Sequence, residues 1–375
     1  MAIPTKLNTK INLDVGVIKN LDVNNFKNIL VLTGSKNSLK IFKESIAPLI
    51  KTKFYLYSGI TTNPNEQIIY NITNYARDKN IDAIISVGGG SVMDSGRMIS
   101  LLLSHSGFLH DYAIGGTIGS LGISPKLIYH ITVPTISGTG AEISSKATFM
   151  HNNTSQIISS PYLIPNETYI DPGLMIDIPK KLWATIAFDC FTNSLEAYVS
   201  IYATPTSDIF AEDALKTCIK HIPTILKDNN NINVIKKIVV ASINSLIASN
   251  MASVGAIHAI AGPISAKFNI YHGTALAMAC APVCEMNYEF NKPKFNKVKK
   301  LFGRSDAKIK TVINSFIDGL NINIPSIKSK LTAEVVREIA NESMNADMRG
   351  NPKLMTYEDI KKIIENIKYY VYLRD

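Results

Sequence analysis

Uninterrupted apolar runs that stop at polar turns dominate the first half of the chain. Runs of this length, without alternation, are typical of strands buried on both faces of a parallel sheet. The pattern predicts strands over residues 28–33, 54–57, 82–87, 126–133 and 168–171. Residues 65–78 carry apolar side chains at helical spacing, so a strand–helix–strand unit is expected there. The first half therefore predicts an open α/β sheet.

The pattern changes to long helical segments near Pro179. Helices are predicted over residues 181–202, 207–222, 235–252, 332–345 and 357–370. Ser207 is the expected N-cap of the second of these, and Thr356 with Asp359 the capping pair of the last. We therefore predict an α/β nucleotide-binding domain over residues 1–178 and an all-α domain over residues 179–375.

Length and composition agree with two folded domains. A chain of 375 residues exceeds what one hydrophobic core usually serves, and 46% apolar with 18% charged residues excludes a disordered chain. We see neither an apolar leader nor a run of about 18 apolar residues, and we expect a cytoplasmic protein with no membrane partner. The four cysteines form no CxxC pair, so neither a disulfide framework nor a cysteine metal site is expected.

The net charge of +9 raises the question of an anionic partner. The densest basic clusters, residues 297–300 and 328–330, contain no interleaved aromatic residues. Such clusters are typical of a solvated surface, and we expect no nucleic-acid partner. The charge does permit an anionic small molecule.

Asp189 lies in a mostly apolar helical segment, where an ionised carboxylate needs a partner. Downstream, His258 and His272 are candidate partners, and Asn193 follows Asp189 by one helical turn. One carboxylate, two imidazoles and an amide would suit Zn²⁺ or Fe²⁺. A metal-free polar cluster is the alternative.

Three glycines, residues 88–90, follow the third predicted strand and open a helix. Glycines let the backbone approach a phosphate, and the free N–H groups of a helix start attract its charge. The segment therefore suits a pyrophosphate, although a tight turn without a ligand has the same sequence pattern.

Several motifs in order resemble the iron-containing (group III) alcohol dehydrogenase family. They are Gly88-Gly89-Gly90-Ser91-x-x-Asp94, residues 134–142 (PTISGTGAE), Asp171-Pro172, residues 189–198, Gly255-Ala256-Ile257-His258, His272-Gly273 and Asn351-Pro352. The resemblance covers almost the whole chain. It implies a nucleotide-binding α/β domain followed by a helical domain, the two-domain architecture shared with dehydroquinate synthase.

The resemblance also implies roles for individual residues. The cofactor would be bound by Gly89, Gly90, Ser91 and Asp94 on its pyrophosphate side and by Thr135 and Ser137 in the cofactor cleft. NAD-preferring members carry an acidic residue after the first strand, whereas this chain has Gly34, Ser35 and Lys36. A hydroxyl, amide N–H groups and a cation there favour NADP(H) over NAD(H).

Asp189, His258 and His272 match three of the family's four metal ligands, and Asn193 replaces the fourth, a histidine. Gly262 stands where members often carry a histidine that assists proton transfer. Asp189 and His272 are the expected catalytic residues. His105, His110, His130, His151 and His221 show no partner at a suggestive spacing and are expected to be structural or at the surface.

The sequence thus predicts an NAD(P)-dependent alcohol dehydrogenase, or aldehyde reductase, that uses Fe²⁺ or Zn²⁺. Its substrate would be a small alcohol or aldehyde, and the family resemblance implies a homo-oligomer. Two alternatives remain open. One is a non-redox lyase similar to dehydroquinate synthase, and the other is a nucleotide-binding protein with a decayed metal site.

Overall fold

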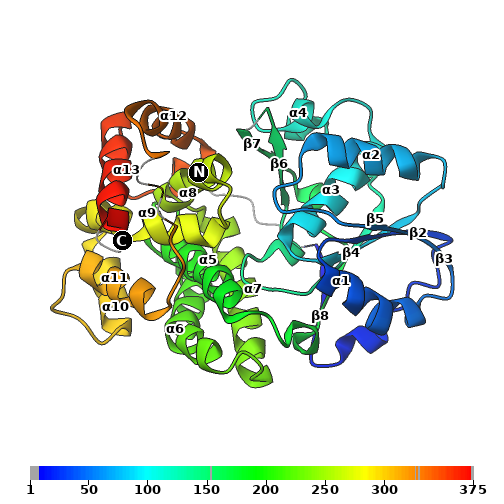
Figure 1. Cartoon of the computed structure of the whole chain (residues 1–375), viewed down its shortest axis with the longest axis horizontal. Coiled ribbons are helices and arrows are strands. Elements are labelled where there is room, and N and C mark those ends of the chain that lie inside the picture. Colours follow the sequence, from blue (N-terminus) through cyan, green and yellow to red (C-terminus); the bar gives the residue numbers. More distant parts are fainter. Residues whose placement is uncertain (1–7, 153, 326, 328–329, 373–375) are drawn as a thin grey trace. The chain divides into compact units, whose positions relative to one another are not determined.

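The computed structural model describes residues 8–152, 154–325, 327 and 330–372 (Figure 1). Its internal contacts define two compact units, and the division falls between Ile176 and Asp177. The sequence placed a domain boundary after residue 178. This division into a nucleotide-binding domain and a helical domain stays a prediction.

The first unit contains a six-stranded sheet in the order β1-β8-β5-β4-β2-β3, and all its strand pairs are parallel. The strands are β1 (Lys10–Leu13), β2 (Asn28–Thr33), β3 (Lys53–Ser58), β4 (Ala83–Gly88), β5 (Tyr129–Pro134) and β8 (Glu167–Ile170). An antiparallel hairpin, β6 (Lys146–His151) and β7 (Thr154–Ser159), forms a separate small sheet. The helices of this unit are α1 (Lys36–Ile41), α2 (Glu66–Arg77), α3 (Gly90–Ser104) and α4 (Leu109–Tyr112).

The continuous apolar runs follow from the position of the sheet between two cores. In β2, Leu30 and Leu32 belong to one buried cluster, whereas Ile29 and Val31 belong to another. Successive side chains of a strand point to opposite faces, so both faces of the sheet are covered. Both sets of positions must therefore be apolar.

The strand order creates a switch point between β2 and β4. After β2 the chain moves outward to β3 at the sheet edge, and it then returns to add β4 on the other side of β2. In open α/β sheets, ligands bind outside the carboxyl ends of the strands at such a switch point. The loop after β2 and the glycine turn after β4 both lie at this end.

The second unit is helical (Figure 1). Its helices are α5 (Lys180–Val199), α6 (Pro205–Lys227), α7 (Ile232–Ala252), α8 (Ala256–Phe268), α9 (His272–Asn287), α10 (Lys292–Leu301), α11 (Ile309–Gly319), α12 (Ala333–Ser343) and α13 (Tyr357–Tyr372). Helix α5 packs against α6, α7 and α9, and it is buried from Trp183 to Val199. The all-round apolar sequence of α5 reflects this central position.

Some sequence predictions of individual elements were wrong. The strand predicted over residues 126–133 begins only at Tyr129, and neither β1 nor the hairpin was predicted. Helix α6 starts at Pro205 with Thr204 as its N-cap, because Thr204 Oγ1 accepts the N–H of Ser207 while Ser207 Oγ accepts the N–H of Thr204. Ser207 is therefore the third residue of a capping box rather than the cap. The Thr356–Asp359 capping pair is confirmed.

The expectation that no segment is long and apolar enough to span a membrane was wrong for helix α7. Among the described residues it alone passes this test, by length and composition, and half of the tested window is buried in the structure. Its packing against α5 and α6 also suits a core helix of a helical domain.

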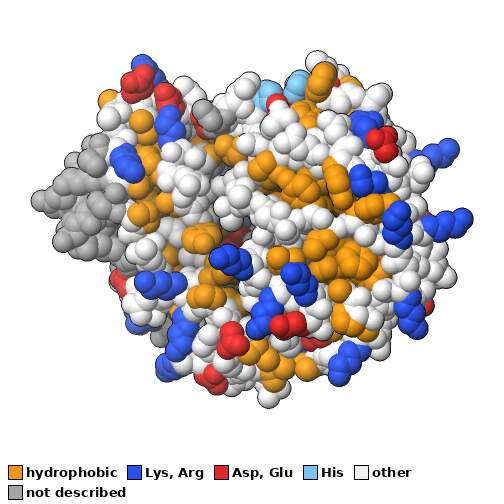
Figure 2. Space-filling view, turned by 45° about the vertical axis from the view of Figure 1, so that its right-hand side comes forward, with side chains coloured by type: hydrophobic (Ala, Val, Ile, Leu, Met, Phe, Trp, Pro, Cys, Tyr) orange, Lys and Arg blue, Asp and Glu red, His pale blue; other side chains and the backbone are white. Residues whose placement is uncertain are grey.

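On the face of the molecule seen in Figure 2, lysine and arginine side chains are scattered rather than gathered.

Candidate metal and cofactor sites

Asp189, His258 and His272 are brought together in the helical unit by three different helices. Asp189 lies in the middle of α5, His258 on the first turn of α8, and His272 is the first residue of α9. One ligand atom from each lies within 4.8 Å of the others, and Asp189 is only 4% exposed. His258 Nε2 lies 3.6 Å from Asp189 Oδ1, and the two imidazole centroids are 5.6 Å apart. This donor set suits Fe²⁺ or Zn²⁺.

Gly273 explains how His272 reaches this position. A Cβ atom on Gly273 would lie 2.0 Å from the carbonyl oxygen of Thr185 in α5, so only glycine allows this approach. Thr185 lies one helical turn before Asp189 and therefore on the same side of α5. The start of α9 is thereby held against α5, beside the carboxylate.

Glu196 supports His258 from the opposite side of the imidazole. Its Oε2 atom lies 2.6 Å from His258 Nδ1, and its Oε1 accepts the N–H of Ile257 at 2.6 Å. Through these two contacts Glu196, which is 4% exposed, caps the start of α8 and orients the imidazole of His258. Metal-binding histidines commonly have such a carboxylate partner at the second ring nitrogen. Glu196 is not among the site residues predicted from the sequence, although it is a second buried carboxylate two helical turns after Asp189.

The two imidazoles have different protonation properties. Burial lowers the pKa of His258, but its interactions with Asp189 and Glu196 outweigh burial and raise that pKa to about 10. Burial dominates at His272 and lowers its pKa below the ordinary value, so this imidazole is neutral at pH 7. A metal ion that bound His258 would therefore have to displace a proton.

Asn193 shares the helix face of Asp189 and is 8% exposed. Its Nδ2 atom donates to Asp189 Oδ1 at 2.6 Å and to the Asp189 carbonyl oxygen at 3.1 Å. In this orientation the Asn193 amide nitrogen, and not the amide oxygen, faces the Asp189 carboxylate.

Gly262 lies one turn after His258, and a Cβ atom there would meet nothing within 4 Å. The space for another side chain is therefore open.

The predicted cofactor loops of the first unit lie next to one another. A Cβ atom on Gly34 would come within 2.9 Å of Val92 Cγ2 at the start of α3, and one on Gly89 within 2.8 Å of Ile136 Cδ1. The Thr135 N–H also donates to the Gly88 carbonyl at 3.0 Å. The loop after β2, the glycine turn and the loop after β5 thus meet at the switch point, as the cofactor prediction requires.

Asp94 ties this region together through a buried arginine that the sequence analysis missed. Its Oδ1 accepts from Arg97 at 2.7 Å, and its Oδ2 accepts the Thr148 N–H at 3.1 Å. Arg97 is 1% exposed and also donates to the carbonyl oxygens of Ala141 and Ser144. Burial raises the pKa of Asp94 to about 6 against the effect of Arg97. One Asp94 oxygen thus holds the loop after β5 through Arg97, and the other holds strand β6 directly.

The remaining predicted cofactor residues differ in whether their side chains already have hydrogen-bond partners within the protein. Ser137 Oγ donates to buried Glu142 at 2.8 Å, so its hydroxyl already has a partner. Ser35 Oγ caps α1 by accepting the Ser38 N–H at 3.2 Å, and Lys36 is exposed. Helix α3 begins at Gly90, with Ser91 in its first turn, and it has no side-chain cap, so its start is open to an anion.

The other histidines were expected to be structural or at the surface, and two of them make local hydrogen bonds. His130 Nε2 lies 2.9 Å from Ser86 Oγ, and His105 Nε2 accepts the Ser124 N–H at 3.0 Å. His110 and His151 converge with Glu66 in the first unit, where they form the second such group of the described residues.

Comparison with known proteins identifies the class that this fold and this site define. The profile of the iron-containing alcohol dehydrogenases matches residues 8–172, and that of the C-terminal part of the Fe-containing alcohol dehydrogenase family matches residues 183–368. The chain belongs to the iron-containing alcohol dehydrogenase family.

Similar proteins include long-chain-alcohol dehydrogenase 1 of Geobacillus thermodenitrificans. It is 28% identical over 255 residues, which cover 67% of this chain and 64% of that protein. The NAD-dependent methanol dehydrogenase of Bacillus methanolicus is 24% identical over 318 residues, 81% and 82% of the two chains. The fold matches an iron-containing alcohol dehydrogenase of Thermococcus thioreducens with a TM-score of 0.86 and 20% identity, over 97% of this chain and 99% of that one.

These matches confirm the predicted family and the predicted architecture of an α/β unit followed by a helical one. At the level of the family, they also confirm the prediction of an alcohol dehydrogenase.

Proposed function

We propose that this protein is a metal-assisted, NAD(P)-dependent alcohol dehydrogenase in which Asp189, His258 and His272 hold the metal. The observation that carries this proposal is the convergence of these three side chains from three helices, at a buried position, with one ligand atom each within 4.8 Å. A metal ion there would replace the proton that His258 otherwise carries as the partner of Asp189 and Glu196. The donor set suits Fe²⁺ or Zn²⁺ and leaves room for a substrate oxygen.

The residues of the chain have distinct roles in this proposal. A metal held there supplies Lewis-acid polarisation of a substrate oxygen, commonly several kcal/mol of transition-state stabilisation. Asp189 contributes the negative charge, and neutral His272 contributes a lone pair. Glu196 fixes the orientation of His258, and Asn193 holds the carboxylate of Asp189. With glycine rather than histidine at position 262, the substrate proton would have to leave through water or the ribose hydroxyls.

The proposed cofactor site lies in the first unit and consists of Gly89, Gly90, Ser91, Asp94, Thr135 and Ser137. The start of α3 binds the pyrophosphate through its free N–H groups. Asp94 and Ser137 position the loop after β5, because their side chains are bonded to Arg97, Thr148 and Glu142. A ribose or amide group of the cofactor would add to these bonds.

We further propose that NADP(H) is preferred over NAD(H). The residues after β2 are Gly34, Ser35 and Lys36, and none is acidic. An aspartate at Gly34 would not fit, because its Cβ would lie 2.9 Å from both the Ile60 carbonyl oxygen and Val92 Cγ2. A hydroxyl and a nearby cation suit a 2′-phosphate, whereas a carboxylate would repel it.

A matched pair of variants at Ser35 tests this preference. Ser35→Asp adds a negative charge, and Ser35→Asn adds none, while both side chains cap a helix as well as serine does. We expect the ratio of kcat/KM for NADPH over NADH to fall by about tenfold in Ser35→Asp and to change little in Ser35→Asn. Equal ratios in the two variants would remove the proposed contact.

The substrate is proposed to be a small alcohol or its aldehyde. The relatives are named for long-chain alcohols, methanol, 1,3-propanediol and 4-hydroxybutyrate, so the family name alone does not select among them. The net charge of +9 makes an anionic aldehyde worth testing. A homo-oligomer in the cytoplasm stays a prediction.

The experiment is an NADPH and NADH oxidation screen over neutral, carboxylated and phosphorylated aldehydes, with Fe²⁺ or Zn²⁺ added. We expect at least one aldehyde to be reduced, and folded His272→Ala protein to be inactive with it. Turnover of a substrate without consumption of NAD(P)H would favour the lyase alternative. A protein that binds nucleotide, yet neither binds metal nor reduces any aldehyde, would favour the decayed site.

A further inference from the structure

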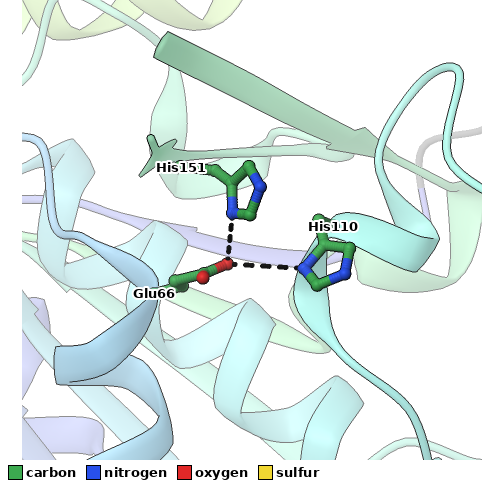
Figure 3. A group of neighbouring side chains, drawn as sticks. All are labelled: Glu66, His110 and His151. Carbon is green, nitrogen blue, oxygen red and sulfur yellow. Dashed lines mark hydrogen bonds and ion pairs between the residues drawn. The ribbon is translucent and has the colours of Figure 1, made fainter. Parts of the chain in front are cut away.

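We propose that Glu66, His110 and His151 form a second metal site, specific for Zn²⁺ or another divalent transition ion that binds imidazole. The three side chains point toward one another from α2, α4 and β6 (Figure 3). Their ligand atoms all lie within 4.8 Å of one another. The site lies in the first unit and shares no residue with the Asp189 cluster.

The distances fit a small ion. Glu66 Oε2 lies 2.8 Å from His151 Nδ1 and 3.6 Å from His110 Nδ1. In a tetrahedral zinc site with ligand bonds of about 2.0 to 2.1 Å, neighbouring ligand atoms are about 3.3 Å apart. The two distances from Glu66 bracket that value, and the two imidazole nitrogens lie within 4.8 Å of each other.

The backbone holds Glu66 and His151 together independently of their side chains. Glu66 is the first residue of α2, and Asn65 caps this helix by accepting the Ile68 N–H at 3.0 Å. Asn65 also forms a bridge with Met150 of β6, and the Met150 N–H donates to the Pro64 carbonyl at 3.0 Å. The start of α2 is thus fixed beside the end of β6, where His151 lies.

The imidazole of His110 is also fixed in place. It stacks on the Phe108 ring with centroids 5.5 Å apart and an interplanar angle of 5°, and its centroid lies 4.8 Å from that of His151. The short helix α4 that carries His110 is tied by Asp111, which accepts from the Phe108 N–H and from Thr117. His110 Nδ1, which faces Glu66, is shielded from solvent and has no hydrogen-bond partner among the described residues. A metal ion would give this nitrogen a partner.

Asn152 fits the role of a supporting residue. Its Nδ2 lies 3.0 Å from His151 Nε2, and a donating amide there requires the proton of His151 to be on Nδ1, toward Glu66. Metal binding at Nδ1 would move that proton to Nε2. A rotation of the Asn152 amide would then let its oxygen accept this proton, since the two amide orientations are interchangeable.

The donor set decides which ions the site takes. Two imidazoles and one carboxylate bind Zn²⁺, Ni²⁺ or Cu²⁺ far better than Mg²⁺ or Ca²⁺, which prefer oxygen ligands. The side chains are 25% to 42% exposed, so an ion can enter and keep a water ligand. A bound ion would join α2, α4 and β6, and β6 also carries Thr148, which bonds Asp94. The expected effect is on stability and not on the chemistry.

Zinc titration of the full-length protein by isothermal calorimetry tests the proposal. We expect two equivalents for the unmodified protein and one for His110→Gln, His151→Gln or Glu66→Gln, with aldehyde reduction unchanged. His272→Ala should lose the other equivalent, and His151→Gln combined with His272→Ala should lose both. His105→Gln, in the same unit but outside the cluster, should keep two.

Two results would overturn the second site. One is an unmodified protein that binds a single zinc, lost in His272→Ala, and the other is a His151→Gln protein that still binds two. An unmodified protein that binds a single zinc, kept in His272→Ala and lost in His151→Gln, would refute the proposed function while leaving this site standing. Glu66→Gln replaces the carboxylate by a neutral amide of the same size at a partly exposed position, so it covers the case in which a histidine variant fails to fold. The zinc-dependent rise in Tm should be smaller in all three single variants.

Discussion

The two histidine clusters contain the same donors, one carboxylate and two imidazoles, but differ in what surrounds them. Asp189 is 4% exposed, and the cluster has Glu196 behind His258 and Asn193 beside Asp189. The Glu66 cluster is partly exposed, and its evident supporting side chain is Asn152. A metal ion in a dry, supported site is held more tightly and polarises a substrate more strongly than one at a wet surface. The donor set therefore suits a metal ion in both clusters, and the surroundings favour the Asp189 cluster for the proposed catalysis.

The largest effect should come from removing one ligand in each cluster. We expect His272→Ala to lower kcat/KM for aldehyde reduction by at least about 10³-fold, because metal polarisation commonly supplies several kcal/mol. His151→Gln should change it less than twofold. Steady-state kinetics, with metal content measured on the same samples, check this. Equal losses in both variants would contradict the assignment of catalysis to the buried cluster.

A smaller effect is expected from removing the support while keeping the ligands. Glu196→Gln replaces a carboxylate by an amide of the same shape, which cannot accept from both His258 Nδ1 and the Ile257 N–H in the present arrangement. We expect metal affinity to fall about 10- to 100-fold, the usual cost of losing such a partner. Competition with a chelator of known affinity measures it.

At the Glu66 cluster, Asn152→Ala is the matching variant. It should weaken zinc binding there less than tenfold, since Asn152 is exposed and water can replace it. A Glu196→Gln protein with unchanged metal affinity would show that support is not what separates the two clusters.

The sequence predicted the Asp189 cluster because its residues lie in recognisable local motifs. Asp189 is a carboxylate in an apolar helix. Gly255 precedes His258 and Gly273 follows His272, and both glycines lie where a Cβ atom would come close to a neighbouring segment. Glu196 carried the same signal as Asp189, a carboxylate in an apolar helix, but without a partner nearby in the chain its role could not be read. The fold, through the start of α8, supplies that partner.

The second cluster could not be predicted in this way. Glu66, His110 and His151 are about 40 residues apart and lie in elements of different kinds. The hairpin that carries His151 was not predicted, and the four-residue helix with His110 is too short to leave a periodic pattern. Likewise Arg97 lies in a predicted helix, but its partners Ala141 and Ser144 are set by the folding of a loop. Long-range contacts of irregular segments are what the sequence pattern leaves out.

A third prediction concerns the replacement of the family's fourth ligand by Asn193. Asn193→His should slow metal loss about tenfold, because imidazole is a better ligand than an amide for Fe²⁺ or Zn²⁺. Asn193→Leu, similar in size but without a donor, is the matched control and should speed metal loss, since Asp189 loses its hydrogen bond. Metal release to a chromogenic chelator measures both rates. Faster release from Asn193→His would mean that overpacking of this buried position outweighs the added ligand.

The smallest effect is expected at Gly262, one turn after His258, where the cluster lacks the histidine found in many relatives. A side chain there has open space, but Gly262 precedes Pro263 within α8, and a Cβ before proline is disfavoured in helical conformation. This cost offsets the gain of about 0.5 to 1 kcal/mol expected when alanine replaces a helical glycine, so Tm should change little.

Gly262→His should raise kcat a few-fold by giving the substrate proton a defined acceptor, whereas Gly262→Ala should leave kcat unchanged. Because the two variants share the cost of the added Cβ, their difference isolates the imidazole. The pH dependence of kcat distinguishes them further, since only the histidine variant should gain a new ionisation in the neutral range. The same kcat and pH profile in both variants would mean that water already carries the proton fast enough, and the surroundings of the buried cluster would then be complete without a histidine at position 262.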